Sequence, residues 1–262
     1  MNRINKLFEE KKGNILSIYF TAGYPEIDST LRIAEALEKA GADFLEIGIP
    51  YSDPLADGPV IQNSSQKSIE NGMTLKLLFE QLKELRKRVT IPVLLMGYVN
   101  PVLQYGVERF CASCEEAGID GVILPDLPMY EYEELYSSCF DQHHLSNIFL
   151  ITPTTSEERI NKIDKLSNGF IYLLSSSSTT GKNLSLSNET ETYFARIKNM
   201  NLKNPAMIGF GISDNKSFSK ASEYANGAIV GSAFVKILDQ DDYLQKIPAF
   251  IQSLKGEKSL AV

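Results

Sequence analysis

The feature that most constrains the fold of this 262-residue chain is an eightfold alternation of short apolar runs and longer amphipathic segments. The apolar runs have the composition of β-strands and occupy residues 15–21, 44–49, 92–96, 121–124, 147–151, 170–174, 206–209 and 227–230. Neighbouring runs are separated by helical units, without a long linker or a break in composition. Strands that alternate with helices form parallel sheets, so the pattern predicts one α/β domain over residues 1–262, a (β/α)8 TIM barrel.

The helical segments are predicted from apolar residues spaced three and four apart and from residues that start or stop helices. They cover residues 29–40, 60–71, 75–88, 105–117, 131–140, 156–166, 189–199, 214–224 and 233–254, and a short helix is expected at 4–8, before the first strand. Two helical segments lie between the second and third strands, so extra helices are expected in the loops. The competing architecture is an open doubly wound sheet, which rarely holds eight equal units without a glycine-rich nucleotide loop; none follows the first strand.

The charge of the chain is acidic. Its 33 Asp and Glu residues outnumber its 26 Lys and Arg residues, which gives a net charge of −7. The densest basic cluster is residues 86–88, typical of the solvated end of a helix, so nucleic acid is disfavoured as a partner. No apolar run approaches the roughly 20 residues that a membrane-spanning helix needs, and we expect a soluble cytoplasmic protein.

Three cysteines, Cys111, Cys114 and Cys139, are an odd number and predict no disulfide framework. Cys111 and Cys114 form a C-x-x-C motif, but both fall on the apolar face of a predicted helix, which favours core residues. A zinc site would need more ligands than the adjacent pair His143 and His144 can supply. Acid–base chemistry therefore falls to carboxylates, tyrosine or lysine.

A carboxylate interrupts the second apolar run. Glu46 lies on one face of this run, and the proline-rich loop that follows carries Asp53 and Asp57 above the end of the strand. These acids could also be purely structural. Glu46 would then be a buried, hydrogen-bonded residue, and the two aspartates would form turns, in which aspartate is common. In a barrel, however, the functional face is built from the loops that follow the strands, and Glu46 and Asp57 fall on that face. The other polar elements there are Asp126 and the segment 175–188.

The last two strands are followed by glycine-rich loops. Gly209, Phe210 and Gly211 follow the seventh strand, and Gly231 and Ser232 follow the eighth, just before a helix. TIM barrels commonly hold a phosphate between these loops, because glycines let backbone N–H groups approach an anion and the helix start adds its positive dipole end. No lysine lies within the apolar core of a strand. We therefore expect cofactor-free proton transfer on a phosphorylated small molecule, with no metal site.

The segment 46–59, EIGIPYSDPLADGP, closely resembles the signature of the tryptophan synthase alpha subunit family over fourteen contiguous residues. Shorter segments that match the family lie at residues 21–25, 125–128, 152–155, 172–175, 209–212 and 230–233. The resemblance covers essentially the whole chain. It implies a lyase of tryptophan biosynthesis that cleaves indole-3-glycerol phosphate to indole and D-glyceraldehyde 3-phosphate.

The resemblance also implies roles for the two catalytic carboxylates. Glu46 would protonate C3 of the indole ring and then take the proton of the adjacent glycerol hydroxyl. Asp57 would accept a hydrogen bond from the indole N–H and stabilise the indolenine cation that C3 protonation creates. The physics agrees, because a carboxyl among apolar neighbours favours its neutral form whereas one on a polar loop stays charged.

The substrate-binding residues implied by the resemblance are Tyr19, Ile61, Tyr172, Thr180, Gly181, Phe210, Gly211, Gly231 and Ser232. Tyr172 would line the pocket beside Asp57, and Tyr19 and Ile61 would pack the indole ring. Thr180 would meet Asp57 when the loop after the sixth strand closes as a lid and excludes water. This loop departs from the family pattern by serines at positions 176 and 178, where arginine and glycine often stand.

The family works as a complex in which two alpha chains join a dimer of beta subunits. Pyridoxal phosphate belongs to the beta subunit, so this chain is expected to bind no cofactor. The loop around Asp53 and Pro54 resembles the part that contacts this partner. Two other functions stay open: an isomerase of phosphorylated sugars, which would share the phosphate anchor, and a catalytically silent subunit that only activates a partner enzyme.

Overall fold

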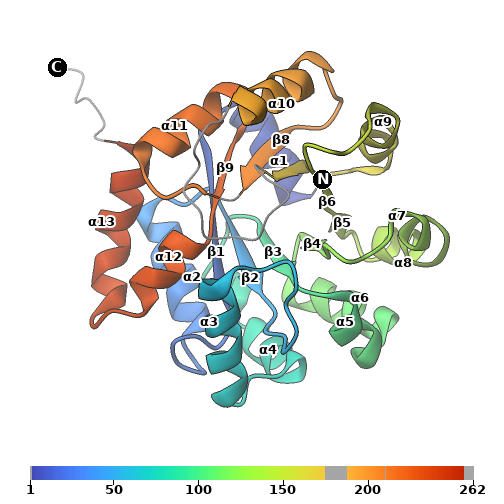
Figure 1. The fold of residues 1–262 in the computed structure, drawn as a ribbon. Helices are drawn as coiled ribbons and strands as arrows, with labels where there is room; N and C mark the ends of the chain where they lie inside the picture. Colours follow the sequence, from blue (N-terminus) through green and yellow to red (C-terminus); the bar gives the residue numbers. More distant parts are fainter. Residues whose placement is uncertain (1, 175–187, 210, 257–262) are drawn as a thin grey trace.

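The computed structural model describes residues 2–174, 188–209 and 211–256. Within these residues nine strands form one parallel sheet in the order β5-β4-β3-β2-β1-β9-β8-β7-β6. The strands are β1 (Ile15–Thr21), β2 (Phe44–Gly48), β3 (Val93–Met96), β4 (Gly121–Ile123), β5 (Ser146–Asn147), β6 (Phe149–Ile151), β7 (Ile171–Leu174), β8 (Ala206–Gly209) and β9 (Gly227–Val230). Figure 1 shows the helices arranged around these strands, as predicted for a (β/α)8 barrel.

The barrel is closed through the fifth predicted strand, which changes partner along its length. β5 pairs with β4, and β6 pairs with β7, so the two edges of the sheet belong to one short segment of chain. Between them the Ile148 N–H donates to the carbonyl of Val122 over 2.9 Å. The expected eight-unit barrel is therefore confirmed, and its ninth strand arises from this division.

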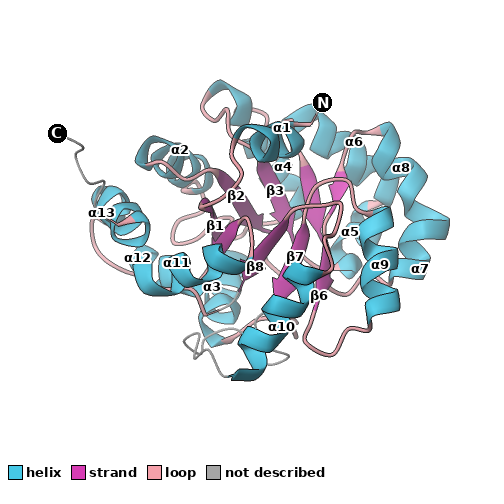
Figure 2. Cartoon of the chain, turned by 90° about the horizontal axis from the view of Figure 1, so that it is seen from above, coloured by secondary structure: helices cyan, strands magenta, loops and turns pink. Residues whose placement is uncertain are grey.

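The helices lie at the ends and on the outside of the barrel (Figures 1 and 2). Their bounds are α1 (Arg3–Glu10), α2 (Thr30–Ala40), α3 (Pro59–Glu70), α4 (Leu75–Leu82), α5 (Val99–Tyr105), α6 (Val107–Ala117), α7 (Met129–Glu131), α8 (Ser137–Gln142), α9 (Glu157–Leu166), α10 (Asn188–Asn199), α11 (Asn215–Tyr224), α12 (Ser232–Leu238) and α13 (Tyr243–Lys255). A 3-10 turn, Leu85–Lys87, follows α4, and a π-helical turn, Tyr132–Tyr136, joins α7 to α8. No helix of the described residues is long and apolar enough to cross a membrane.

Four helical segments differ from the prediction. The segment 75–88 is helical only to Leu82, and the 3-10 turn Leu85–Lys87 follows. The segment 105–117 is preceded by a separate helix, α5, which was not predicted because it has only seven residues. The segment 131–140 is interrupted by the π-helical turn, and the segment 233–254 is divided into α12 and α13. The second division follows from backbone conformation: Asp242, just before α13, has a left-handed φ of 56°, which an α-helix cannot contain.

The interior of the barrel is packed with apolar side chains at the end where the strands begin. Phe8 of α1 lies 5.9 Å from the ring of Phe170, which lies 5.5 Å from the ring of Phe44 on β2. Ile4 of α1 belongs to the same buried cluster. The helix α1 therefore covers this end of the barrel.

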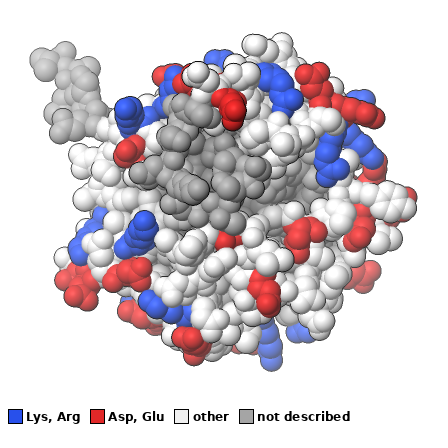
Figure 3. All heavy atoms as spheres, viewed as in Figure 1, with Lys and Arg blue, Asp and Glu red and all other residues white. Residues whose placement is uncertain are grey.

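A second apolar cluster lies between the barrel and its surrounding helices. It contains Cys111 and Cys114 of α6, both fully buried free thiols, so their assignment to the core is confirmed. On the face drawn in Figure 3, acidic and basic side chains are interspersed. This distribution differs from the one-signed stripe that is typical of nucleic-acid-binding surfaces.

Candidate active site

Glu46 is a fully buried acid in the middle of β2. Its only hydrogen bond within the described residues comes from Ser17 of β1, whose Oγ donates to Oε1 over 3.1 Å; Oε2 is buried without a partner there. Burial raises the pKa of Glu46 to about 8, against the opposing effect of the Ser17 hydrogen bond. At neutral pH this carboxyl is therefore mostly protonated and able to act as an acid.

Asp57 precedes α3 and is only 6% exposed. Tyr98 donates its hydroxyl proton to Oδ2 of Asp57 over 3.0 Å, and the same hydroxyl oxygen accepts the N–H of Ala56 over 3.0 Å. Burial raises the pKa of Asp57 to about 6, whereas the Tyr98 hydrogen bond lowers it. The loop is thus less solvated than its polar sequence suggests, yet at pH 7 the ionised form of Asp57 still exceeds the neutral form by about tenfold.

Two buried tyrosines stand beside these carboxyls, Tyr19 on β1 and Tyr172 on β7. Burial raises the pKa of both phenols, and the negative charge of Asp57 contributes, so both stay neutral at physiological pH. Each ring fits because the adjacent strand carries a glycine. A Cβ atom at Gly48 would overlap the Tyr19 hydroxyl, and one at Gly209 would overlap the Tyr172 hydroxyl.

The predicted apolar wall lies next to the glycine loop after β9. A Cβ atom at Gly231 would lie 3.6 Å from Ile61 Cδ1 and 3.6 Å from Tyr19 Cδ1. Ile61 is buried in the first turns of α3. The structure therefore brings together Tyr19, Ile61 and Gly231, which the sequence placed on three separate elements.

Part of the predicted phosphate site is described. Gly209 ends β8, Gly211 follows with a left-handed φ of 76°, and Gly231 precedes α12, where Ser232 is the first residue. Phe210 lies outside the described residues, as do Thr180, Gly181 and the two serines at positions 176 and 178. The carbonyl of Gly231 accepts the N–H groups of Phe234 and Val235, which fixes the start of this helix.

Tyr98 and Asp126 were not predicted to serve Asp57. Tyr98 directly precedes α5, and its ring lies 5.2 Å from that of Tyr51. Asp126 accepts the N–H of Val99 with both carboxylate oxygens, over 3.0 and 3.2 Å. The sequence predicts Asp126 on the functional face. Its connection to Asp57 runs through neighbouring residues: Asp126 binds the N–H of Val99, and Tyr98, the preceding residue, donates to Asp57.

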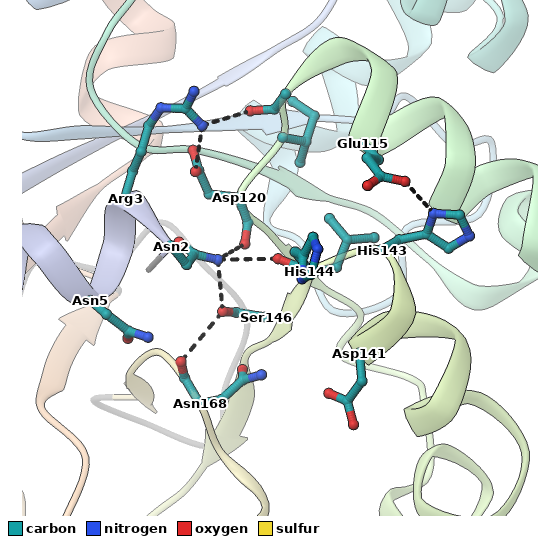
Figure 4. A pocket seen from close by; sticks show the side chains of 13 residues that line it. Asn2, Arg3, Asn5, Glu115, Asp120, Asp141, His143, His144, Ser146 and Asn168 are labelled. Carbon is teal, nitrogen blue, oxygen red and sulfur yellow. Dashed lines mark hydrogen bonds and ion pairs between the residues drawn. The ribbon is translucent and has the colours of Figure 1, made fainter.

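A cavity of about 800 Å³ lies at the opposite end of the barrel, where the strands begin (Figure 4). Several of its polar side chains hold α1: Asn2 donates to the carbonyl of Asp120 over 2.6 Å and to Ser146 Oγ over 3.2 Å, while Arg3 pairs with the Asp120 carboxylate. His143, which also lines the cavity, contacts Glu115. Among the described residues, no group of three or more His, Cys, Asp or Glu side chains is arranged to hold a metal ion.

Comparison with known proteins gives a consistent match. A family model described as "Tryptophan synthase alpha chain" matches residues 5–259. The tryptophan synthase alpha chain of Flavobacterium psychrophilum is 57% identical over 255 residues, which are 97% of this chain and 100% of that protein.

Solved structures agree with this match. The tryptophan synthase alpha chain from Legionella pneumophila subsp. pneumophila has a TM-score of 0.87 at 37% identity and covers 97% of this chain and 96% of its own. A chain of tryptophan synthase from M. tuberculosis, in an aminoacrylate-bound form, has a TM-score of 0.85 at 28% identity, covering 97% of this chain and 98% of its own.

Proposed function

Because the chain belongs to the tryptophan synthase alpha chain family, a family of lyases, we propose that Glu46 and Asp57 perform the cleavage of indole-3-glycerol phosphate. The observation that carries this proposal is the difference between the two buried carboxyls. Glu46 is neutral and Asp57 is ionised over the same range of pH, because their pKa values are about 8 and about 6. One acid and one base at a single site are what this reaction requires.

In the first step the carboxyl of Glu46 gives its proton to C3 of the indole ring. The ring becomes a cationic indolenine, and the N–H group acquires much of the positive charge. The Asp57 carboxylate accepts the hydrogen bond of this N–H and stabilises the cation. Since Asp57 is nearly excluded from water, its charge acts more strongly than it would on the surface.

In the second step the bond between indole C3 and the first glycerol carbon breaks. Its electron pair returns to the ring and restores neutral indole. The hydroxyl on that glycerol carbon loses its proton to the Glu46 carboxylate and becomes the aldehyde of glyceraldehyde 3-phosphate. Glu46 ends the cycle protonated, so the proton balance closes without any cofactor in this chain.

We propose that Tyr19, Ile61 and Tyr172 hold the indole ring and that the loops after β8 and β9 hold the phosphate. Gly211 and Gly231 carry no side chain and so let an anion approach the backbone N–H groups of these loops, whereas the space beside Gly209 is filled by the ring of Tyr172. Ser232 and Phe210 belong to these loops by sequence. The lid role of Thr180 and Gly181 rests on the sequence resemblance alone.

We also propose that the partner is a tryptophan synthase beta subunit in an α2β2 assembly, the subunit to which pyridoxal phosphate belongs. Asp53 is exposed, as a contact residue must be, whereas Pro54 is buried within the chain. Leu55 is instead 86% exposed, the highest exposed fraction among the large apolar side chains of the described residues. We therefore assign the contact to Asp53 and Leu55, with Pro54 shaping the loop. The free thiols suit a cytoplasmic location, where cysteines stay reduced.

The test is the release of indole from indole-3-glycerol phosphate by the purified chain, alone and with a tryptophan synthase beta subunit. We expect indole in both conditions and faster release with the partner. A folded chain that produces no indole in either condition would contradict the proposal. Stimulation of the partner by such an inactive chain would identify a silent activator.

A further inference from the structure

We propose that Ser17 is a positioning residue for Glu46: its hydroxyl holds Oε1 of the carboxyl and leaves Oε2 as the oxygen that exchanges protons with the substrate. This inference rests on the proposed role of Glu46 as the acid of the reaction. It adds a residue from a neighbouring strand that belongs to none of the sequence motifs discussed above.

The geometry of the two strands brings Ser17 to Glu46. In the register of β1 and β2, Ser17 pairs with Phe44 and Tyr19 pairs with Glu46. Ser17 and Tyr19 are two residues apart and so share one face of β1, as Phe44 and Glu46 share one face of β2. Ser17 is therefore the diagonal neighbour of Glu46 on the interior side, one step deeper in the barrel, where its Oγ reaches Oε1 over 3.1 Å.

Both side chains are fully buried, so water does not replace this contact. Within the described part of the chain, Ser17 supplies the one hydrogen bond to the carboxyl, and Oε2 is without a partner. A carboxyl held by one oxygen has a defined orientation, and the other oxygen stays available. A chain with an apolar residue at position 17 would leave both oxygens unheld in the apolar interior.

The hydroxyl also suits the change of charge during the reaction. A serine hydroxyl can donate or accept a hydrogen bond, so it accommodates the neutral acid and then donates to the carboxylate that remains after proton transfer. Donation to the charged form stabilises it, which opposes the effect of burial on the pKa of Glu46. Ser17 therefore sets how readily Glu46 releases its proton.

The other titratable groups around Glu46 are Tyr19 on β1, Tyr172 on β7 and Asp57 before α3. Burial raises the pKa of both tyrosines, so neither ionises in the range where Glu46 titrates. Asp57 titrates lower, with a pKa of about 6. The basic limb of the pH–rate profile therefore reports Glu46.

The test is the pH dependence of kcat/KM for indole release by Ser17→Ala in the full chain. We expect the basic limb to move to higher pH by about one unit, a tenfold change in proton affinity, with a lower kcat. Ser17→Cys keeps the size of the side chain but is a weaker hydrogen-bond donor. Its basic limb should lie between those of the wild type and Ser17→Ala. The matched control is Ser167→Ala, which removes another buried hydroxyl, one that donates to the carbonyl of Ile163 over 2.8 Å.

A second measurement does not depend on turnover. The midpoint of thermal unfolding of Ser17→Ala, followed across the same pH range, should continue to fall at pH values where the wild-type midpoint has levelled off. A basic limb and an unfolding profile that both match the wild type would overturn the inference. If Glu46→Gln were fully active, the proposed function would fail instead, whatever Ser17 does; the two failures are thus distinguishable.

Discussion

Glu46 is the side chain on which the proposed chemistry depends most directly. Glu46→Gln keeps the shape of the side chain but removes the transferable proton, so we expect indole release to fall by about 100-fold to 10,000-fold. Glu80→Gln, an exposed change on α4, is the matched control and should keep wild-type rates. Single-turnover rates at saturating substrate would measure the effect. Wild-type turnover by a folded Glu46→Gln chain would remove Glu46 from the mechanism.

The same residue predicts an unusual dependence of stability on pH. The pKa of Glu46 is raised from 4.5 in the unfolded chain to about 8 in the folded one. Between these values the folded state retains a proton that the unfolded state has lost, so the free energy of unfolding falls as pH rises, by about 1.4 kcal/mol per unit. Glutamine does not titrate, so the free energy of unfolding of Glu46→Gln does not fall in this way as pH rises. Chemical denaturation should therefore show the variant gaining stability over the wild type from pH 5 to pH 8, and a constant difference would contradict the raised pKa.

Tyr98 is expected to control the ionisation of Asp57. Tyr98→Phe removes the hydroxyl that donates to the carboxylate, so the pKa of Asp57 should rise above its value of about 6. Activity needs the ionised form and is lost as pH falls through this pKa; the acid limb of kcat/KM should therefore move to higher pH by about one unit. The substrate phosphate also titrates at about pH 6, and it does so with the wild type and with Tyr98→Phe alike. The measurement is therefore the difference between the pH profiles of these two proteins. Tyr105→Phe, which loses a contact with Ser113 over 3.3 Å, is the control and should leave the limb unchanged.

At the scale of the secondary-structure elements, the sequence predicted the strands well because each is a short apolar run with polar loops on both sides. The helix α5 was missed because its seven residues are too few to show a period. The division of the fifth strand could not be predicted, since it depends on where the two edges of the barrel meet. Glu46 and Asp57 are predicted from local sequence, whereas Ser17 and Tyr98 contact them from positions 29 and 41 residues away in the chain.

The glycine at the end of β8 is an element-scale requirement of the site. A Cβ atom at Gly209 would overlap the ring of Tyr172 on β7, and a buried ring between two strands has little room to move. We expect Gly209→Ala to displace Tyr172, to reduce kcat/KM by more than tenfold and to destabilise the fold by about 1–3 kcal/mol. Gly13→Ala is the matched control, because nothing lies within 4 Å of its added Cβ. The measurements are kcat/KM and the free energy of unfolding of both variants. Equal values for Gly209→Ala and Gly13→Ala would show that Tyr172 can adapt to the added methyl group.

At the scale of the whole molecule, the two ends of the barrel have different tasks. We infer that the chain is a single domain, because β1 and β9, from opposite ends of the sequence, pair within one sheet. The end where the strands begin is sealed by α1, whereas the loops after β2, β3 and β4 at the other end are joined to one another. Tyr98 contacts the loop that carries Asp57, and Asp126 holds the start of α5. The large apolar side chains exposed in the described part of the chain lie in the connections after these three strands: Leu55 in the loop after β2, Leu103 on α5, Tyr130 on α7 and Leu135 in the π-helical turn.

This arrangement places the proposed partner surface directly above the chemistry, on the loop that ends at Asp57. Leu55→Asp should weaken binding of the beta subunit by at least tenfold, because it buries a charge where the wild type buries an apolar side chain. Cleavage by the isolated chain should change little, since the Leu55 side chain points into solvent. Asn5→Asp adds the same charge at the opposite end of the barrel and should leave binding intact. Titration of the beta subunit, followed through the rate of indole release, measures affinity and activation together. Wild-type affinity in Leu55→Asp would move the interface away from this loop, and the link from Tyr98 to Asp57 would then serve the active site alone.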